Sequence, residues 1–455
     1  MAEIMPLKAV VYNPAAVRDM NKVMAPPYDV ISPAYQDELY ARDPHNFVKI
    51  DLNKTGPSDN EGNDRYSRAS ALLKDWLASN VLARDERPAV YFYTQTYKLK
   101  DGARQTRKGF VALARLEEFG KGGIHPHEKT LSGPKADRLR LMQTTNANLS
   151  CIFSLYSEPS LGINRLLEGA IKDAAPIIDV KDDDAIENRL WRIDDPAVIA
   201  KTVEAMKDKP LFIADGHHRY ETALNYRREE LAKTKNPTGR EAYNYIMMYF
   251  SNMDDEGMTI WPTHRVIRGL AGFDAKAFIG QCNPYFDLEE MPCAPDNGET
   301  ARKEFLNKVE KNGKKAIAFG LYMRGADAYY VLTLRSKDVM DKVFGPGIPD
   351  VFKALDVTVL HSLILSKMLG IGQEAQEKQL NLVYVKNSEE AIDGAKKDNN
   401  QMAFILNPTR IEQVKAVALA GHVMPQKSTY FYPKLLSGLT INLLDGEVEG
   451  TGERV

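Results

Sequence analysis

The chain has 455 residues, of which 44% are hydrophobic and 27% are charged, so at about 100 to 200 residues per domain it is a multidomain globular protein. Sixty Lys and Arg residues against 62 Asp and Glu residues leave a net charge of -2, which argues against nucleic acid and anionic membranes as partners. Any site for an anion must therefore be local.

The cysteines and the lengths of the apolar stretches indicate in which cellular compartment the protein is expected. Cys151, Cys282 and Cys293 are an odd number at wide spacing, which fits neither a disulfide framework nor a structural zinc site. No stretch approaches the roughly 18 apolar residues that span a bilayer, and the N-terminus lacks a signal-peptide pattern. We expect a cytoplasmic protein with no membrane partner, and the sequence indicates no oligomeric state.

Hydrophobic periodicity predicts both helices and strands in the first third of the chain. Apolar residues recur with helical spacing over 69–77. The aromatic and β-branched stretches 89–99 and 109–116 predict an antiparallel hairpin. Residues 53–64 are rich in Gly, Asn, Asp and Pro, which predicts a surface loop.

The middle of the chain predicts a helix, a strand, a tight turn and a second helix. Asp195 and Pro196 are typical of a helix start, and Pro210 ends that helix. Residues 211–214 are wholly apolar and predict a buried strand, which Asp215 and Gly216 end.

The last third continues this mixed pattern. Residues 316–323 and 328–334 predict another hairpin, 355–368 a helix and 402–406 a strand. The fold class expected is therefore α/β of the α+β kind, with mixed sheets. Domain limits near residues 120 and 237 would divide the chain into regions 1–120, 121–237 and 238–455.

The sharpest local signal is the sequence ADGHHRYETAL at 214–224. Gly216 follows a strand and precedes a helix, where a missing side chain lets the backbone turn and a ligand approach. The first amides of that helix, at His217, His218 and Arg219, would face an anion together with the positive end of the helix dipole. Arg219 adds a planar cationic fork suited to phosphate oxygens.

Two other interpretations of this stretch remain open. Asp215 could simply cap the helix, with two half-exposed histidines and an arginine paired to a carboxylate. Metal binding is less favoured, because adjacent histidines on one helical turn point in different directions.

A second signal is GGIHPHEKTLSGPKADRLRL at 122–141. Glu128 lies among His125, His127 and Lys129 in a segment punctuated by Pro and Gly, where a carboxylate can be held and used as a base. A charged surface loop is the alternative.

Three further clusters give weaker signals. Residues 424–435 alternate Lys and hydroxyl groups with aromatic rings, which suits a phosphate and base site or an edge strand equally well. Asp29 within 25–32, and His264 and Arg265 after Pro262, fit tight turns. The P-loop, Rossmann, zincin and serine-hydrolase signatures are all missing from the sequence.

The stretch 214–224 resembles the box of the ParB/sulfiredoxin superfamily, in which a strand enters a Gly-x-x-Arg turn and a helix whose start holds nucleotide phosphates. Its Asp-Gly-His-His-Arg variant is similar to that of free-serine kinases. Those kinases also carry a Pro-His-Glu whose glutamate is the catalytic base, and Pro126-His127-Glu128 matches it. Over its length the chain resembles the bacterial and archaeal domain of unknown function 1015 family, through segments spread over 25–435.

The resemblance implies a ParB/sulfiredoxin-like nucleotide-binding core in 121–237, flanked by N- and C-terminal α/β regions. It implies a kinase that transfers phosphate from ATP or ADP, with Mg²⁺, to the hydroxyl of a small, serine-like metabolite. The catalytic residues would be Glu128, His127 and Asp215, with Asp215 also a metal contact. The nucleotide phosphates would be bound by residues 216–220, namely Gly216, His217, His218, Arg219 and Tyr220.

Two alternatives to the kinase remain. One is a ParB-like switch that binds or hydrolyses a nucleotide without turning over a small molecule. The other is a hydrolase with a metal held by histidines and an aspartate. Glu128 and Asp215 are 87 positions apart (215 minus 128), which is longer than a compact kinase module would require.

Overall fold

The computed structural model describes residues 2–60, 62–128, 132–293 and 298–449, which form two compact units. Unit 1 holds the described residues 2–126, 132–259 and 433–449, and unit 2 holds 127–128 and 260–432. The chain therefore leaves unit 1, builds unit 2 and returns to unit 1. The limits expected near 120 and 237 do not coincide with the borders of these units, because strands on both sides of each limit share one sheet.

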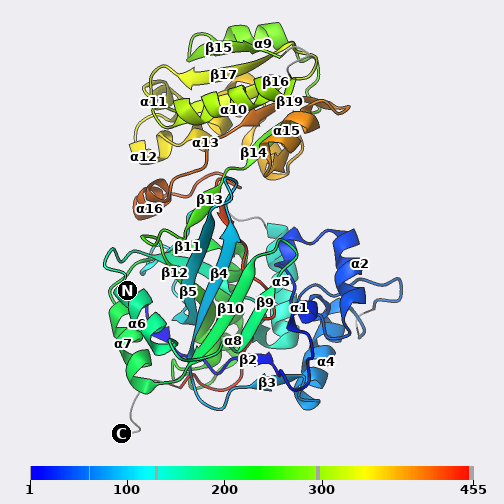
Figure 1. Cartoon of the computed structure of the whole chain (residues 1–455), viewed down its shortest axis with the longest axis vertical. Helices are drawn as coiled ribbons and strands as arrows, with labels where there is room; N and C mark the ends of the chain where they lie inside the picture. The colour runs from blue at the N-terminus through cyan, green and yellow to red at the C-terminus, as the bar shows by residue number, and fades with distance from the viewer. Residues whose placement is uncertain (1, 61, 129–131, 294–297, 450–455) are drawn as a thin grey trace. The chain divides into compact units, whose positions relative to one another are not determined.

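Unit 1 is built on a mixed nine-stranded sheet with the order β6-β11-β8-β12-β5-β4-β10-β9, and β1 pairs with β5 (Figure 1). β6 and β11 run parallel, as do β8 and β12, and the remaining pairs are antiparallel. The expected mixed α/β class is thus confirmed. The strands are β1 (Ile4–Met5), β4 (Val90–Lys98), β5 (Arg104–Arg115), β6 (Ile124–His125), β8 (Ile152–Tyr156), β9 (Ile178–Lys181), β10 (Glu187–Ile193), β11 (Leu211–Asp215) and β12 (Tyr245–Asn252).

One face of this sheet packs against helices. Phe92, Phe110 and Phe250 contribute alternate residues of three neighbouring strands to the core, and Tyr220 and Leu224 contribute one side of α8. β12 is buried along its whole length, as expected of a strand that is covered on both faces. The helices that contribute to this core are α5 (Ser132–Thr145), α6 (Gly162–Ala170), α7 (Pro196–Met206) and α8 (His217–Lys233).

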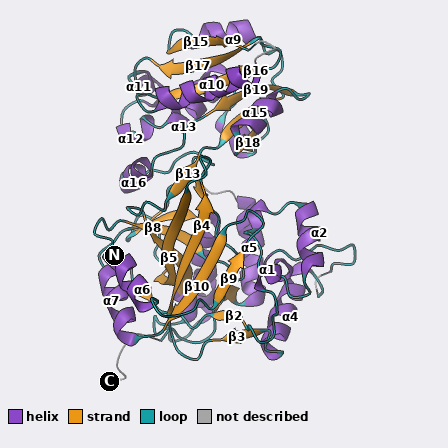
Figure 2. Ribbon diagram, in the orientation of Figure 1, coloured by secondary structure: helices purple, strands orange, loops and turns teal. Residues whose placement is uncertain are grey.

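The opposite face is crossed by residues 433–444, which we call the C-terminal strap. Gln95 Nε2 donates to the carbonyl oxygen of Lys434 over 2.9 Å, and Arg107 Nη2 donates to that of Pro433 over 2.6 Å. Small elements complete unit 1 (Figure 2): α1 (Met20–Val23), η1 (Tyr28–Val30), α2 (Pro33–Arg42), α3 (Val48–Asp51), α4 (Arg65–Ala78), η2 (Ala242–Asn244), and the strand pairs β2 (Val10–Tyr12) with β3 (Leu82–Arg84) and β7 (Ala147–Asn148) with β21 (Asn442–Leu443).

Unit 2 is built on an antiparallel six-stranded sheet with the order β15-β17-β16-β19-β14-β18. Phe305 of α10 and Ile392 of α15 pack on one face of it. Trp261 stacks on Tyr432 with ring centroids 3.7 Å apart, where the chain enters and leaves the unit. The strands are β13 (Thr259–Trp261), β14 (His264–Arg268), β15 (Phe286–Pro292), β16 (Ala318–Met323), β17 (Ala328–Leu334), β18 (Leu382–Val385), β19 (Asn400–Ile405) and β20 (Tyr430–Tyr432).

The helices of unit 2 include one with unusual winding. The sequence predicts one helix over 355–368, but a single α-turn, α13 (Asp356–Val359), leads into the π-helix η4 (Leu360–Met368). The other helices are α9 (Ala275–Cys282), α10 (Gly298–Gly313), α11 (Val339–Phe344), α12 (Asp350–Lys353), α14 (Gln373–Glu377), α15 (Ser388–Ala395) and α16 (Ile411–Leu419). In the part of the chain that the structure describes, no helix combines the length and apolar character needed to cross a bilayer.

Candidate functional site

The turn between β11 and α8 forms as the sequence predicts. β11 is buried except at its last residue, and its pairing with β8 shifts register between Ile213 and Asp215. Gly216 has a φ of +91°, a left-handed conformation that glycine adopts without strain, and α8 begins at the next residue. A bulge of this kind redirects a side chain at the end of a strand, and here that side chain is the Asp215 carboxylate.

The guanidinium of Arg219 folds back over Gly216. A Cβ atom at position 216 would lie 3.0 Å from both Nε and Nη2 of Arg219, so only glycine leaves this space open. Nη1 donates to the Ser150 hydroxyl at 3.0 Å and to the Cys151 carbonyl oxygen, and Nη2 donates to Asp215 Oδ2 at 3.3 Å. Guanidinium has five N–H donors. Three of them are used in these hydrogen bonds, and Gly216 lies over the face of the guanidinium, because its Cβ position is about equally far from Nε, Nη2 and Cζ (3.0, 3.0 and 3.1 Å).

Asp215 lies between two cations. Lys434 Nζ is 3.1 Å from Asp215 Oδ1, and Arg219 contacts the other carboxylate oxygen. The two cationic side chains are only 14% and 13% exposed. Asp215 is thus paired with two partly buried cations, which are groups of the kind that bind phosphate.

A second charged group borders the same region. Arg138 Nη1 donates to Asp51 Oδ1 at 3.2 Å, Arg138 Nη2 lies 2.6 Å from Asp137, and the Arg138 guanidinium stacks over the Tyr28 ring at 4.2 Å. Burial raises the pKa of the Asp51 carboxyl, while Arg138 and Arg219 oppose that shift. Arg138 is thus paired with two carboxylates, whereas Arg219 and Lys434 are the cations that contact Asp215.

A small cavity of about 30 Å³ connects these two charged groups, and its size corresponds to about one or two water molecules. Asp51, Arg138, Ser150 and Arg219 are among its lining residues. Burial raises the pKa of Tyr28 to about 12, although Arg219 and Arg138 oppose the shift, so its hydroxyl stays protonated at neutral pH. The phenol is therefore a neutral partner at this site.

The sequence suggested Tyr220 as a phosphate-binding residue, but its side chain lies in the core. It is fully buried, its hydroxyl donates to the Glu117 carbonyl oxygen at 2.8 Å and accepts from the Glu117 N–H at 3.0 Å, and its ring stacks on Phe119. We therefore leave Tyr220 out of the phosphate site. His217 and His218 are the first two residues of α8, at the positive end of its dipole.

Glu128 and His127 belong to unit 2 by their contacts. Glu128 Oε1 accepts a hydrogen bond from the Lys427 N–H at 2.5 Å. The His127 ring is fully buried, and its Nε2 is 2.8 Å from the Thr429 hydroxyl. Of their predicted neighbours, His125 lies in β6 and stacks on Phe212 of the adjacent β11, and Lys129 lies outside the described residues.

The predicted Mg²⁺ contact, Asp215, has Lys434 and Arg219 as partners of its two oxygens. Within the described ranges, no group of three or more His, Cys, Asp or Glu side chains could hold a metal ion. In kinases Mg²⁺ is held by one or two carboxylates together with the substrate phosphates, so the contact of Asp215 with Mg²⁺ stays a prediction.

Sequence reasoning missed several members of the cluster. Tyr28, Asp51, Arg138 and Ser150 were not singled out, although Tyr28 and Arg138 lie in the segments PPYDVIS and PKADRL that carry the family resemblance. The stretch 424–435 is divided between the two units. Lys427 and the strand β20 at 430–432 belong to unit 2, whereas Lys434 belongs to unit 1 and contacts Asp215.

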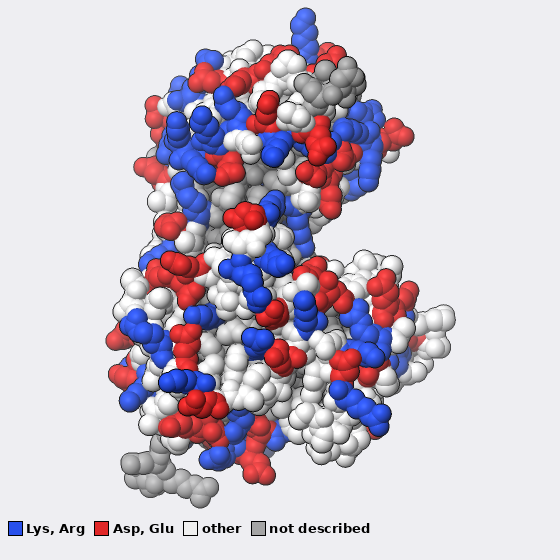
Figure 3. Space-filling view, in the orientation of Figure 1, with Lys and Arg blue, Asp and Glu red and all other residues white. Residues whose placement is uncertain are grey.

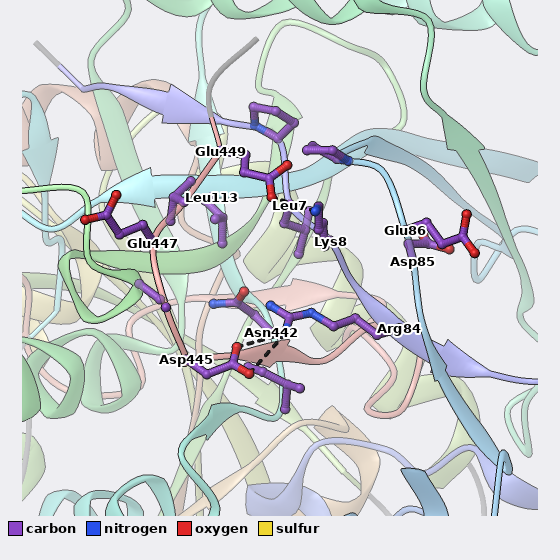
Figure 4. Close-up of a pocket in the computed structure, with 16 residues that line it drawn as sticks. Leu7, Lys8, Arg84, Asp85, Glu86, Leu113, Asn442, Asp445, Glu447 and Glu449 are labelled. Carbon is purple, nitrogen blue, oxygen red and sulfur yellow. Dashed lines mark hydrogen bonds and ion pairs between the residues drawn. The ribbon is translucent and has the colours of Figure 1, made fainter. Parts of the chain in front are cut away.

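A larger cavity of unit 1, of about 450 Å³, contains none of the predicted residues (Figure 4). Figure 4 shows Arg84 pointing toward Asp445, with which it forms an ion pair of 2.9 Å. Two cations, Lys8 and Arg84, line it together with five carboxylates, which would repel a phosphate: Asp85, Glu86, Asp445, Glu447 and Glu449. On the visible face of each unit, basic and acidic side chains are interspersed (Figure 3).

Comparison with known proteins assigns a family. Among solved structures, the chain is similar to a conserved hypothetical protein from Pyrococcus furiosus, with 16% identity over 70% of this chain and 92% of that one and a TM-score of 0.33. It is also similar to a free serine kinase in complex with AMP (14% identity, 70% and 92% covered, TM-score 0.30). A third is SbnI with a C-terminal truncation from Staphylococcus aureus (11% identity, 73% and 87% covered, TM-score 0.34).

No curated protein matches the chain. The model of the family described as "Protein of unknown function (DUF1015)" matches residues 4–358, which is most of the chain. The chain therefore belongs to the DUF1015 family.

Proposed function

We propose that this protein is a nucleotide-dependent kinase that binds the phosphates of ATP or ADP at the β11–α8 turn. The observation that carries the proposal is the pair of cations, Arg219 and Lys434, that converges on Asp215 beside a glycine with no room for a side chain. A planar guanidinium held beside bare backbone is suited to phosphate oxygens.

The helix α8 also favours a phosphate as the ligand. α8 extends over 17 residues from His217, so the positive end of its dipole lies at the turn and favours an anion there. The Gly-x-x-Arg spacing of Gly216 and Arg219 between a buried strand and a long helix supports a ParB/sulfiredoxin-like core within 121–237.

The acceptor in our proposal is the hydroxyl of a small, serine-like metabolite. Its oxygen attacks the terminal phosphorus, the bond from that phosphorus to the bridging oxygen breaks, and the leaving nucleotide takes the electron pair. The hydroxyl proton passes to Glu128. This role of Glu128 rests on the Pro126-His127-Glu128 motif and stays a prediction, as does the role of His127, which we assign to positioning.

The test combines nucleotide binding with turnover. Purified protein is incubated with labelled ATP or ADP and a panel of hydroxylated metabolites, and binding is measured separately by calorimetry. We expect a phosphorylated product that falls at least about 100-fold in Glu128→Gln, since a positioned base typically contributes 10²–10⁴ in rate. Nucleotide affinity should be retained in that variant.

A separate pair of variants tests the proposed phosphate site. Arg219→Ala should weaken nucleotide binding at least about tenfold, whereas Arg228→Ala, on the same helix and paired only with exposed groups, should not. Full affinity in Arg219→Ala would remove the site, and normal turnover in Glu128→Gln would remove the base. Nucleotide binding with no transfer to any acceptor would instead favour the ParB-like switch.

A further inference from the structure

Unit 2 contains a cavity of about 340 Å³ that the proposed kinase function does not use. Its volume is in the range of small-molecule sites, which combine apolar walls with a few convergent polar groups. Phe344, Phe352 and Tyr384 supply aromatic walls, and His361, Ser366 and Gln376 are among the polar lining residues. All of these residues lie in unit 2.

The π-helix η4 explains why its polar residues reach one cavity. In an α-helix of 3.6 residues per turn, His361 and Ser366 would be separated by about 140° around the axis. In η4 the hydrogen bonds run five residues back, as in the 3.0 Å bond from the Leu369 N–H to the Ile364 carbonyl oxygen. Residues five apart therefore share a face, and both His361 and Ser366 line the cavity.

His361 lines the cavity as a neutral ring. Its Nδ1 is 2.8 Å from Gln376 Oε1, and its Nε2 accepts from Arg265 Nε at 3.3 Å. Burial and the Arg265 charge lower the pKa of His361 to about 3. Since Gln376 Nε2 donates to the His361 and Ile371 carbonyl oxygens, its Oε1 accepts, and the imidazole carries its proton on Nδ1.

The charges around the cavity disfavour ionic ligands. Arg265 is only 1% exposed, stacks over the Tyr384 ring at 5.1 Å and donates to the Lys427 carbonyl oxygen at 3.1 Å, so it lies behind the wall. Among the described lining residues there is no Lys or Arg to meet an anion, and the carboxylate, Glu377, accepts from Gln373 at 2.7 Å. Glu377 in the lining and Arg265 behind His361 and Tyr384 carry opposite charges, so the surroundings favour neither a cation nor an anion.

We propose that this cavity binds a neutral planar heterocycle of nucleobase or nucleoside size. The aromatic walls offer stacking surfaces for a flat ring. The Ser362 and Ser366 hydroxyls and the amides of Gln373 and Gln426 offer both donors and acceptors to its edge. This site is separate from the phosphate site of unit 1 and goes beyond the proposed kinase function.

The experiment measures binding of adenosine, guanosine, cytidine and uridine to the full chain by thermal shift and calorimetry. We expect at least one nucleoside to raise Tm and to bind saturably, because a ligand that binds only the folded state must stabilise it. Ser366 is exposed, and a tryptophan side chain at this position would fill the cavity. The Ser366→Trp variant should therefore bind the nucleoside at least about tenfold more weakly. Lys367→Ala, the next and equally exposed residue, is the matched control and should bind normally.

Arg219→Ala separates this site from the nucleotide site, and it should retain nucleoside binding. Loss of nucleoside binding in Arg219→Ala would overturn the proposal, because the nucleoside would then belong to the unit 1 site. Unchanged binding in Ser366→Trp, or no binding of any of the four nucleosides, would also overturn it. If the Ser366→Trp variant does not fold, Ser366→Leu replaces it, because the leucine side chain fills less of the cavity.

Discussion

Lys434 Nζ lies 3.1 Å from Asp215 Oδ1, although 219 positions separate these residues in the sequence. The C-terminal strap thereby adds a cation to a turn that is otherwise built from consecutive residues of β11 and α8. The backbone of the same strap residues is held by Gln95 and Arg107, so the position of Lys434 is fixed by the sheet beneath it. This contact and its neighbours lead to three predictions, and a fourth concerns His361 of unit 2.

Lys434→Met should weaken nucleotide binding about tenfold, which corresponds to about 1.4 kcal/mol. The thioether side chain keeps much of the apolar stem and removes the charge, so the loss reports the electrostatic contact. Binding is measured by calorimetry. The control is Lys8→Met, which removes another lysine of unit 1 in an ion pair, 2.6 Å from Glu449, but at an exposed place. Equal affinities in the two variants would contradict a role for Lys434.

Gly216→Ala should lower the free energy of unfolding and also impair nucleotide binding. A side chain at a φ of +91° is strained, by about 1–3 kcal/mol, and its Cβ would press on the Arg219 guanidinium. Gly102→Ala is the matched control, because Gly102 has a φ of +86° and nothing within 4 Å of the added atom. Urea unfolding of both variants should show the larger loss at Gly216, and only that variant should lose nucleotide affinity.

Tyr220→Phe should lower stability without changing nucleotide affinity. The substitution leaves the N–H and C=O groups of Glu117 without their phenol partner, which costs about 1–3 kcal/mol for a buried polar group. Urea unfolding and calorimetry on the same preparation separate the two effects. A variant with unchanged stability and weakened nucleotide binding would return Tyr220 to the phosphate site, where the sequence first suggested it.

His361 should make unit 2 sensitive to acid. Its pKa of about 3 in the folded protein lies below the usual value of about 6.5 for an unfolded chain. The stability it contributes is therefore present above pH 6.5 and is lost as pH falls toward 3, by at most about 1.4 kcal/mol per pH unit.

The measurement is urea unfolding between pH 7 and pH 4 for wild type and His361→Gln. Glutamine cannot take up a proton, so the variant should lose less stability than wild type over this range. Parallel curves for the two proteins would show that the His361 ring contributes no titration.

The sequence predicted the β11–α8 element well because its determinants are local. The apolar run 211–214, the glycine after Asp215 and the periodicity of the next helix all act over a few residues, and they place Arg219 at the helix start. The rest of the cluster is not local: Arg219 bonds Ser150 from 69 positions away. No pattern within one segment encodes such a contact, so the distant partners of Arg219, Ser150 and Cys151, could not be predicted.

The π-helix η4 and the position of Tyr220 are two other features that the sequence did not predict. Leu355, Val359, Leu360 and Leu363 recur with a spacing that predicted a helix, but apolar spacing over one or two turns does not distinguish α from π winding. Tyr220 lies on the apolar side of α8, in the core of unit 1, whereas the family resemblance implied a role in phosphate binding.

The return of the chain to unit 1 has a consequence for biosynthesis. A ribosome makes the strands of the nine-stranded sheet and all of unit 2 before it reaches residue 433. A nascent chain that stops short of this point carries Arg219 and Asp215 but not Lys434. The cluster of Asp215, Arg219 and Lys434 is therefore completed only in the last stage of translation.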